Sequence, residues 1–487
     1  MKKLVAAAAA LVALLVFAPW GFGKLAERHI DEGINRVLEE MPYMAVVERK
    51  YTAGWFRSEQ IVTFELRNPW TDMLQEVMAG KPAAPQGEAA AGHDEDDADA
   101  DESAEPVSTQ VAPPTDRSAR VTVRNEILHG PVLWPFGLGA ARVDTHIDWS
   151  DEIRKTLVST FGDDEPFEIA TRVGFFGGGT ATVSAEARSL KPEEGVEVSW
   201  DDFEFNVHFS RDAAQMDFDG EWPRFEVRSE GTHFVMRDFS AKGTAERILN
   251  ELYDSDGIFR IGSIRVDGSG DIIETNDIEY RVETKPRGDF IDLSFQFGSG
   301  PVKSKQFSLT EAHYDFTLRQ LHAESLDKLM FAIKSSYARA LDATPDVSLG
   351  MTEDERKTFF TLLAHDPEFA IDRISLATKS GNGVIKGVLR FKGLTEADFE
   401  AGGLAMVGKL EAELDIDVSD AFINDFGGDS ASVDMVVGEG YAARKDGRVT
   451  SRIEFKAGQL NINGKTQAIP GLGGPPAQDV GAAAGPE

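Results

Sequence analysis

Residues 44–66 read MAVVERKYTAGWFRSEQIVTFEL, and this stretch decides what kind of fold the sequence predicts. Residues 46–51 and 61–66 are rich in the β-branched and aromatic side chains that favour strands. Gly54 lies between them and supplies the permissive backbone that a tight connection needs. We therefore expect two strands joined by a turn, with Trp55 and Phe56 at one end of the sheet that they begin.

Later segments alternate apolar and polar residues with the period of a half-buried strand. They are residues 196–200, 203–209, 291–297, 314–318, 385–391, 410–418, 453–455 and 460–462. Glycine-rich turn signals at 177–179, 380–383 and 445–447 separate such segments. Because only one side of each strand is apolar, the pattern favours an antiparallel sheet with one covered face.

Helical patterns interrupt the strands in four places. We expect helices over 151–161 after Ser150, over 245–253 after Thr244, and over 326–341, and a fourth that begins with a capping box at Thr352. The predicted fold class is mainly β with peripheral helices (α+β). It is a long curved antiparallel β structure that follows an N-terminal transmembrane helix.

An uncharged apolar run covers residues 4–23, between Lys2-Lys3 and Lys24. About 20 such residues can span a bilayer as a helix. The same run also fits a cleaved signal peptide or a buried helix. We expect an uncleaved signal anchor over 1–23, because Trp20 and Phe22 suit the membrane interface better than a cleavage site. The positive-inside rule then exports the rest of the chain, so we expect a single-pass protein of a bacterial inner membrane with its body in the periplasm.

Residues 24–42 carry apolar side chains at helical spacing and predict an amphipathic helix that ends at Pro42. Such a helix can lie on lipid headgroups or pack on the folded body, and we expect packing. Residues 43–79 then hold the first strands with the Gly-Trp-Phe motif, residues 118–468 form the β-rich body, and residues 469–487 form a flexible tail.

Residues 80–117 differ from the rest of the chain in composition. They contain no aromatic residue and include the acidic run HDEDDADADE. A segment with so little apolar surface cannot offset its ordering entropy, so we expect a disordered acidic insertion. The run lacks the glycine and the terminal glutamate of a calcium-binding EF-hand loop, which argues against a calcium site.

The composition and the missing motifs exclude several classes of function. A formal net charge of −33 argues against nucleic acid as a partner. The chain has no cysteine, and its nine histidines have no metal-ligand spacing, so no metal site is predicted. No Gly-x-Ser-x-Gly element is present. We therefore predict no catalytic residues and no cofactor, although a pair of acidic side chains brought together by the fold stays open as an alternative.

Several landmarks occur in a fixed order along the chain. They are Tyr51, Gly54, Trp55, Phe56 and Ser58, then His129, Gly130 and Pro131, and finally Gly458, Asn463 and Gly464. This order resembles the YdgA-like family, a bacterial domain of unknown function with an N-terminal membrane anchor. The acidic tract between the first two landmarks departs from that pattern as an insertion. The resemblance implies an inner-membrane protein with a periplasmic body, and it supplies no reaction and no catalytic residues. A looser likeness, of topology only, is to the AsmA-like proteins, which are proposed to carry lipids.

Two functions follow as expectations, and a third is less favoured. The first is lipid or hydrophobe binding in envelope maintenance, along an apolar sheet face that stays partly open. The alternative is a homodimeric scaffold or interaction protein that uses sheet edges or the helix at 324–341. A hydrolase or transferase is the third. Within the landmarks, Trp55, Phe56 and His129 are expected to support the end of the sheet, with contact to a ligand or partner as the alternative.

Overall fold

The computed structural model describes residues 44–67 and 118–468, together with Asn35 and Met41. Within the second range it leaves out residues 134, 150–153, 156, 159–161, 164, 194, 269, 343–351 and 429. The predicted anchor (1–23), the acidic insertion (80–117), the tail (469–487) and nearly all of the predicted helix at 24–42 lie outside the described residues.

The described residues form one sheet of 24 strands. The strands are β1 (Met44–Thr52), β2 (Arg57–Arg67), β3 (Ser118–His129), β4 (Ala141–Asp148), β5 (Glu168–Val173), β6 (Gly179–Ala185), β7 (Arg188–Glu193), β8 (Val196–Trp200), β9 (Phe203–Phe209), β10 (Gln215–Ser229), β11 (Thr232–Arg247), β12 (Tyr253–Gly268), β13 (Asp271–Arg287), β14 (Phe290–Ser299), β15 (Val302–Lys303), β16 (Ser308–Leu309), β17 (Glu311–His322), β18 (Glu368–Ala377), β19 (Asn382–Phe391), β20 (Leu410–Ser419), β21 (Ala443–Lys445), β22 (Arg448–Lys456), β23 (Gln459–Ile462) and β24 (Lys465–Ala468). The prediction of a mainly β, antiparallel fold is confirmed for this part of the chain.

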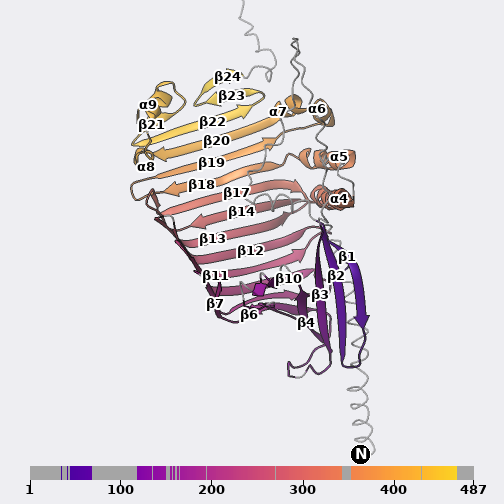
Figure 1. The fold of residues 1–487 in the computed structure, drawn as a ribbon. Coiled ribbons are helices and arrows are strands. Elements are labelled where there is room, and N and C mark those ends of the chain that lie inside the picture. Colours follow the sequence, from indigo (N-terminus) through magenta and orange to yellow (C-terminus); the bar gives the residue numbers. More distant parts are fainter. Residues whose placement is uncertain are drawn as a thin grey trace, which may run out of the picture.

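Neighbouring strands follow the order of the chain almost throughout. β1 pairs with β2, β2 with β3, and so on to β6, which pairs with β9. The β7–β8 hairpin, which lies between β6 and β9 in the chain, pairs through β8 with the later part of β10. The β15–β16 hairpin lies between β14 and β17 in the chain and pairs through β15 with β13, while β14 pairs with β17. In Figure 1 the strands from β10 to β22 lie stacked one above another, whereas β1–β4 run steeply across that direction. Short-range hairpins therefore build one long, strongly twisted sheet.

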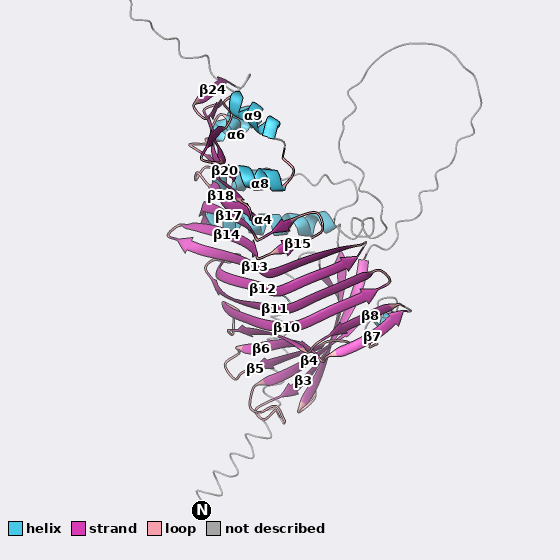
Figure 2. Ribbon diagram, turned by 90° about the vertical axis from the view of Figure 1, so that its left-hand side faces the viewer, coloured by secondary structure: helices cyan, strands magenta, loops and turns pink. Residues whose placement is uncertain are grey.

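Within the described residues, the helices with defined bounds gather at the part of the sheet that holds β14 to β24 (Figures 1 and 2). They are α4 (Ala323–Asp342), α5 (Glu353–Leu363), α6 (Glu396–Glu400), α7 (Gly403–Val407), α8 (Asp420–Asp425) and α9 (Ser430–Gly438). The expected helix at 326–341 and the capping box at Thr352 are confirmed. Arg154, Lys155, Leu157 and Val158 are helical, in agreement with the helix expected after Ser150. Within the described residues, no helix has both the length and the apolar character needed to cross a membrane.

The prediction of a helix over 245–253 is wrong. Residues up to Arg247 belong to β11, and Tyr253 begins β12. Ala245 lies opposite Met216 on one neighbouring strand and Ser255 on the other. A helical pattern of only nine residues is a weak preference, and the backbone pairing available on both sides of β11 overrides it.

One face of the sheet is apolar across most of its strands. Residues directly opposite each other in an antiparallel sheet point to the same side. The pairing therefore places one residue of each successive strand in a single row, which is Phe205, Gly220, Ala241, Phe259, Tyr280, Phe297, Tyr314, Ile374, Ile385 and Ile416. We call the side that carries this row the apolar face.

The described helices cover parts of the apolar face. Leu293 and Leu318 on β14 and β17 pack with the buried cluster of Leu321, Leu329 and Leu362, which joins β17 to α4 and α5. At the far end of the sheet, α8 and α9 lie over β20 and β22 and leave a hollow of about 460 Å³ beneath them. Between β9 and β13, where the structure describes no helix, the face has no such cover (Figure 2).

Candidate functional site

The turn between β1 and β2 holds the first group of predicted site residues. The Gly54 N–H donates to Ser58 Oγ at 3.2 Å, and the Ser58 side chain is buried. A Cβ atom on residue 54 would lie 2.0 Å from the Arg57 carbonyl oxygen, so only glycine fits there. Gly54 and Ser58 therefore shape the turn, while Trp55 and Phe56 at its tip are 44% and 55% exposed.

The second group, His129-Gly130-Pro131, lies directly beside this turn. The His129 N–H donates to the Phe56 carbonyl oxygen at 2.8 Å, and His129 Nδ1 lies 3.4 Å from the Trp55 carbonyl oxygen. His129 itself is 2% exposed. Two motifs more than 70 residues apart in the sequence thus meet at one end of the sheet.

Gly130 and Pro131 fix the loop that follows β3. Gly130 donates to the Ala140 carbonyl oxygen at 2.7 Å, and a Cβ atom on residue 130 would lie 1.8 Å from the Gly139 carbonyl oxygen. The Pro131 carbonyl oxygen accepts from Gly139 at 3.2 Å. Tyr51 packs against the buried cluster of Ile127, Ala141 and Val143. Among the predicted site residues, only Trp55 and Phe56 therefore present large side chains to the surroundings.

A larger feature lies on the apolar face, where β9 to β12 enclose an open hollow of about 530 Å³. Its walls are almost wholly apolar and include Phe205, Val207, Phe218, Trp222, Phe239 and Phe259. This volume lies within the range of pockets that bind small molecules. We call it the β9–β12 hollow.

Glycines explain why the sheet is hollow here. Gly220 lies opposite Phe205, and a Cβ atom on residue 220 would lie 2.0 Å from Phe205 Cδ1. Gly243 lies opposite Phe218, and its Cβ would lie 2.4 Å from Phe218 Cε1. Both rings therefore lie over a neighbouring glycine and not upright from the sheet. The space above them stays open because no side chain rises from the glycine positions.

The apolar face continues from this hollow toward the α8–α9 hollow. Large apolar side chains on the strands between the two hollows are each more than a third exposed: Tyr280, Phe295, Tyr314, Phe369 and Leu389. Phe259 and Tyr280 lie 6.2 Å apart between ring centroids, Phe297 and Tyr314 lie 6.0 Å apart, and Phe316 stacks on Phe369 at 5.9 Å. The two hollows are therefore joined by a continuous apolar surface that is accessible along part of its length.

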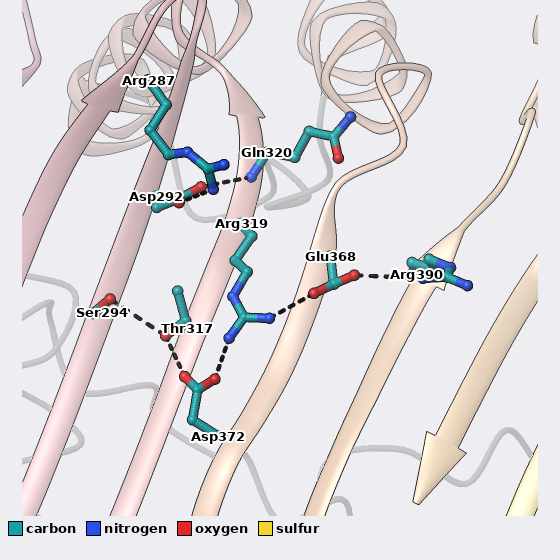
Figure 3. Close-up of polar contacts among 9 residues, drawn as sticks. All are labelled: Arg287, Asp292, Ser294, Thr317, Arg319, Gln320, Glu368, Asp372 and Arg390. Carbon is teal, nitrogen blue, oxygen red and sulfur yellow. Dashed lines mark hydrogen bonds and ion pairs between the residues drawn. The ribbon is translucent and has the colours of Figure 1, made fainter.

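The opposite face of the same sheet is charged, and its groups satisfy one another (Figure 3). Arg319 on β17 forms an ion pair with Glu368 on β18 at 2.9 Å and contacts Asp372, while Glu368 also faces Arg390 on β19 at 3.6 Å. Further along, Glu411 accepts from Lys456 and from Arg390, both at 3.0 Å. The hydrogen bond from Lys456, followed by that from Arg390, holds the pKa of Glu411 below its ordinary value. We call this side the charged face.

The residues that build the β9–β12 hollow were mostly missed by sequence reasoning. Only β9 was predicted, from its alternating FEFNVHF pattern, whereas the three long strands β10–β12 were not. The signal that could have found the hollow is the glycine content of these strands, because Gly220, Gly243 and Gly257 break the alternation of side chains. Within the described ranges, no group of three or more histidine, aspartate or glutamate residues is arranged to hold a metal ion.

Comparison with known proteins gives one result. The model of a family described as "Bacterial protein of unknown function (DUF945)" matches residues 1–470. Neither the curated proteins nor the solved structures contain a match to the chain. Because the family match covers nearly the whole sequence, the chain belongs to the DUF945 family of bacterial proteins of unknown function.

Proposed function

We propose that this protein binds the acyl part of a lipid, or a similar apolar molecule, on the apolar face of its sheet, and that it acts by binding and not by catalysis. The observation that carries the proposal is the β9–β12 hollow and the exposed apolar row that leads from it. Exposed apolar surface of this extent on a soluble body is uncommon and marks an interaction site.

The chemistry of the hollow favours a hydrocarbon over a polar ligand. Each Å² of apolar surface removed from water contributes about 25 cal/mol, and this gain needs no directional partner. A polar ligand would leave its donors and acceptors without hydrogen bonds against walls made of Phe205, Phe218 and Trp222. The topological likeness to AsmA-like proteins, which is a resemblance only, agrees with a lipid ligand.

We further propose that the chain is anchored in a bacterial inner membrane by residues 1–23, with its body in the periplasm. The support is the apolar run at 4–23 with two lysines before it. Alkaline phosphatase fused after residue 468 is active only outside the cytoplasm, so we expect an active fusion. An inactive but stably produced fusion would place the body in the cytoplasm and contradict this part of the proposal.

Two neighbouring residues of β9 provide a test of lipid binding. Val207 lines the hollow and is 39% exposed, whereas His208 points to the charged face, where it contacts Thr180. A photoreactive benzoylphenylalanine placed at residue 207 or at residue 208 samples the two sides of one strand in the full-length protein inside living bacteria. After illumination, we expect a lipid adduct, detected by mass spectrometry, at residue 207 and not at residue 208.

The proposal fails if residue 207 gives no lipid adduct, or if both positions react equally. Adducts to another protein at residue 207 would also contradict it.

A second measurement introduces a charge into the hollow and needs no crosslinking. Val207→Lys puts an ammonium group into the hollow and should lower the amount of co-purified lipid at least tenfold. A tenfold decrease corresponds to a loss of about 1.4 kcal/mol in binding free energy. The matched control His208→Lys adds the same side chain to the charged face and should leave the lipid content unchanged.

A second candidate, a homodimeric scaffold, is favoured by one observation on α4. This helix presents Met330, Phe331 and Ile333 to solvent, and Phe331 is 61% exposed. Light scattering on the detergent-solubilised protein measures its mass. A dimer that becomes a monomer in Phe331→Glu would support the scaffold, and a monomeric unmodified protein would exclude it.

A further inference from the structure

We propose that the end of the sheet formed by the turns β1–β2, β3–β4 and β5–β6 docks on the surface of a phospholipid bilayer. The proposal concerns seven residues, which we call the aromatic rim: Trp55, Phe56, Val132, Phe136, Leu138, Phe175 and Phe176. They are distinct from the β9–β12 hollow, and the inference does not depend on the lipid-binding function proposed above.

The turns β1–β2 and β3–β4 lie at the lower end of β1–β4 in Figure 1, and hydrogen bonds place the β5–β6 turn beside them. The first two are joined by the hydrogen bond from His129 to Phe56. The second and third are joined by hydrogen bonds from Ala140 to the Val173 carbonyl oxygen at 2.9 Å and from Arg172 Nη2 to the Leu138 carbonyl oxygen at 2.9 Å. The apolar tips therefore form one surface.

The exposure of this surface is unusual. Each of the seven side chains is at least 43% exposed, and Phe176 is 92% exposed. Trp and Phe at the tips of turns are the residue types enriched where proteins meet the interfacial layer of a membrane. Burying them in that layer removes their apolar surface from water without requiring a matching protein surface.

Charge separates this edge from the opposite one. The turns read AGWFR (53–57), GPVLWPFGLGA (130–140) and GFFGG (174–178), and they contain none of the 83 acidic residues of the chain. At the other edge Arg67 is paired with Ser118, and the sequence between these two residues contains the run HDEDDADADE. A membrane with anionic lipids attracts basic residues and repels acidic ones, so these three turns suit it better than the opposite edge does.

Arginines lie directly behind the rim. The Arg142 guanidinium lies 3.8 Å from the centre of the Phe136 ring and is also paired with Asp144 at 2.7 Å. Arg172 holds Leu138 through its carbonyl oxygen, and Arg57 follows Phe56 in the first turn. Apolar tips with arginines set back from them match the depth profile of a bilayer, in which the phosphates lie outside the acyl chains.

The path of the chain beside β1 is compatible with this docking. Asn35 is helical, and Arg49 Nη2 donates to Asn35 Oδ1 at 3.5 Å, so the chain before β1 passes beside that strand. Only three residues of β1 separate Arg49 from its end at Thr52, a distance of about 10 Å. The helix predicted over 24–42 would give residues 24–34 a length of about 16 Å, which is enough to bring the end of the apolar run level with the rim.

The absence of cysteine makes the test direct, because a single introduced cysteine is the only site for a thiol-reactive dye. Phe176→Cys and Leu138→Cys report on two turns of the rim. The control Glu230→Cys lies in the turn between β10 and β11, at the opposite edge of the sheet. The full-length protein carrying an environment-sensitive dye is reconstituted into vesicles of phosphatidylethanolamine and phosphatidylglycerol that contain a lipid with a nitroxide near its headgroup.

We expect the dyes at residues 176 and 138 to shift to shorter emission wavelength and to lose most of their fluorescence to the nitroxide lipid. The dye at residue 230 should show neither change. Quenching at both rim positions no stronger than at residue 230 would overturn the proposal. A wavelength shift without quenching would also overturn it, because it would mean that protein, such as a second copy of the chain, covers the rim. Both outcomes are independent of the crosslinking result at residue 207.

Discussion

The two faces of the sheet are stabilised in different ways. On the charged face, Arg319, Glu368 and Arg390 pair across three adjacent strands, so the groups satisfy one another within the sheet. On the apolar face, Leu321 is buried where α4 and α5 pack against it, whereas Tyr280 and Phe295 are more than a third exposed. A charged face of this kind needs no further element to satisfy its polar groups. An apolar face that remains open to water is unfavourable in free energy. We therefore expect the open part of this face to be a binding site.

The largest expected change in stability distinguishes the covered part of the apolar face from the open part. Ile291 is fully buried opposite Leu321, whereas Phe295 on the same strand is 36% exposed. Ile291→Ala should lower the free energy of unfolding by about 2–5 kcal/mol because it leaves a cavity. Phe295→Ala should cost less, although it removes more atoms. Urea denaturation of the purified protein, followed by circular dichroism, measures both, and equal losses would mean that the open part is covered as well as the closed part.

A smaller change in stability tests whether Gly220 is the reason for the β9–β12 hollow. Gly220→Val brings side-chain atoms into the space of the Phe205 ring, which must turn away from the sheet. We expect a loss of about 1–3 kcal/mol in unfolding free energy from this overpacking. The same substitution should also reduce lipid adducts at residue 207, because the displaced ring enters the hollow.

Gly403→Ala serves as a control for this prediction, since a Cβ atom there meets nothing within 4 Å. If Gly220→Val were as harmless as Gly403→Ala in denaturation, the ring of Phe205 would not depend on the glycine opposite it.

The smallest effect belongs to the charged face. Glu411→Gln removes the acceptor charge shared by Lys456 and Arg390 and should cost about 1 kcal/mol near neutral pH, in the range of partly exposed ion pairs. The folded state lowers the pKa of Glu411, so its stabilising contribution is present above the unfolded value of about 4.3 and is lost as the pH falls through the lower folded value.

The difference in stability between the unmodified protein and Glu411→Gln should therefore shrink below about pH 4. A difference that stays constant from pH 7 to pH 3 would show that the charge of Glu411 is not what stabilises the sheet.

Sequence reasoning succeeded where the pattern is local. The alternation in FEFNVHF predicts β9, and the capping box at Thr352 predicts the start of α5, because both depend on neighbours within a few residues. The contact between Phe56 and His129 could not be derived in this way, since it arises from the register of β2 and β3 across a long connection. The β9–β12 hollow was missed for the same reason. Its shape depends on which glycine lies opposite which phenylalanine, and pairing between strands decides that.

The single row that begins at Phe205 and ends at Ile416 has a consequence for movement. Adjacent strands are about 4.8 Å apart, so a hydrocarbon chain lying across them meets a residue without charge at each such interval. No position along this path holds a charge that would stop the chain, and no step requires the whole molecule to return to water. If the proposed apolar ligand binds here, it can therefore travel along the protein by short displacements and exchange one set of apolar contacts for the next.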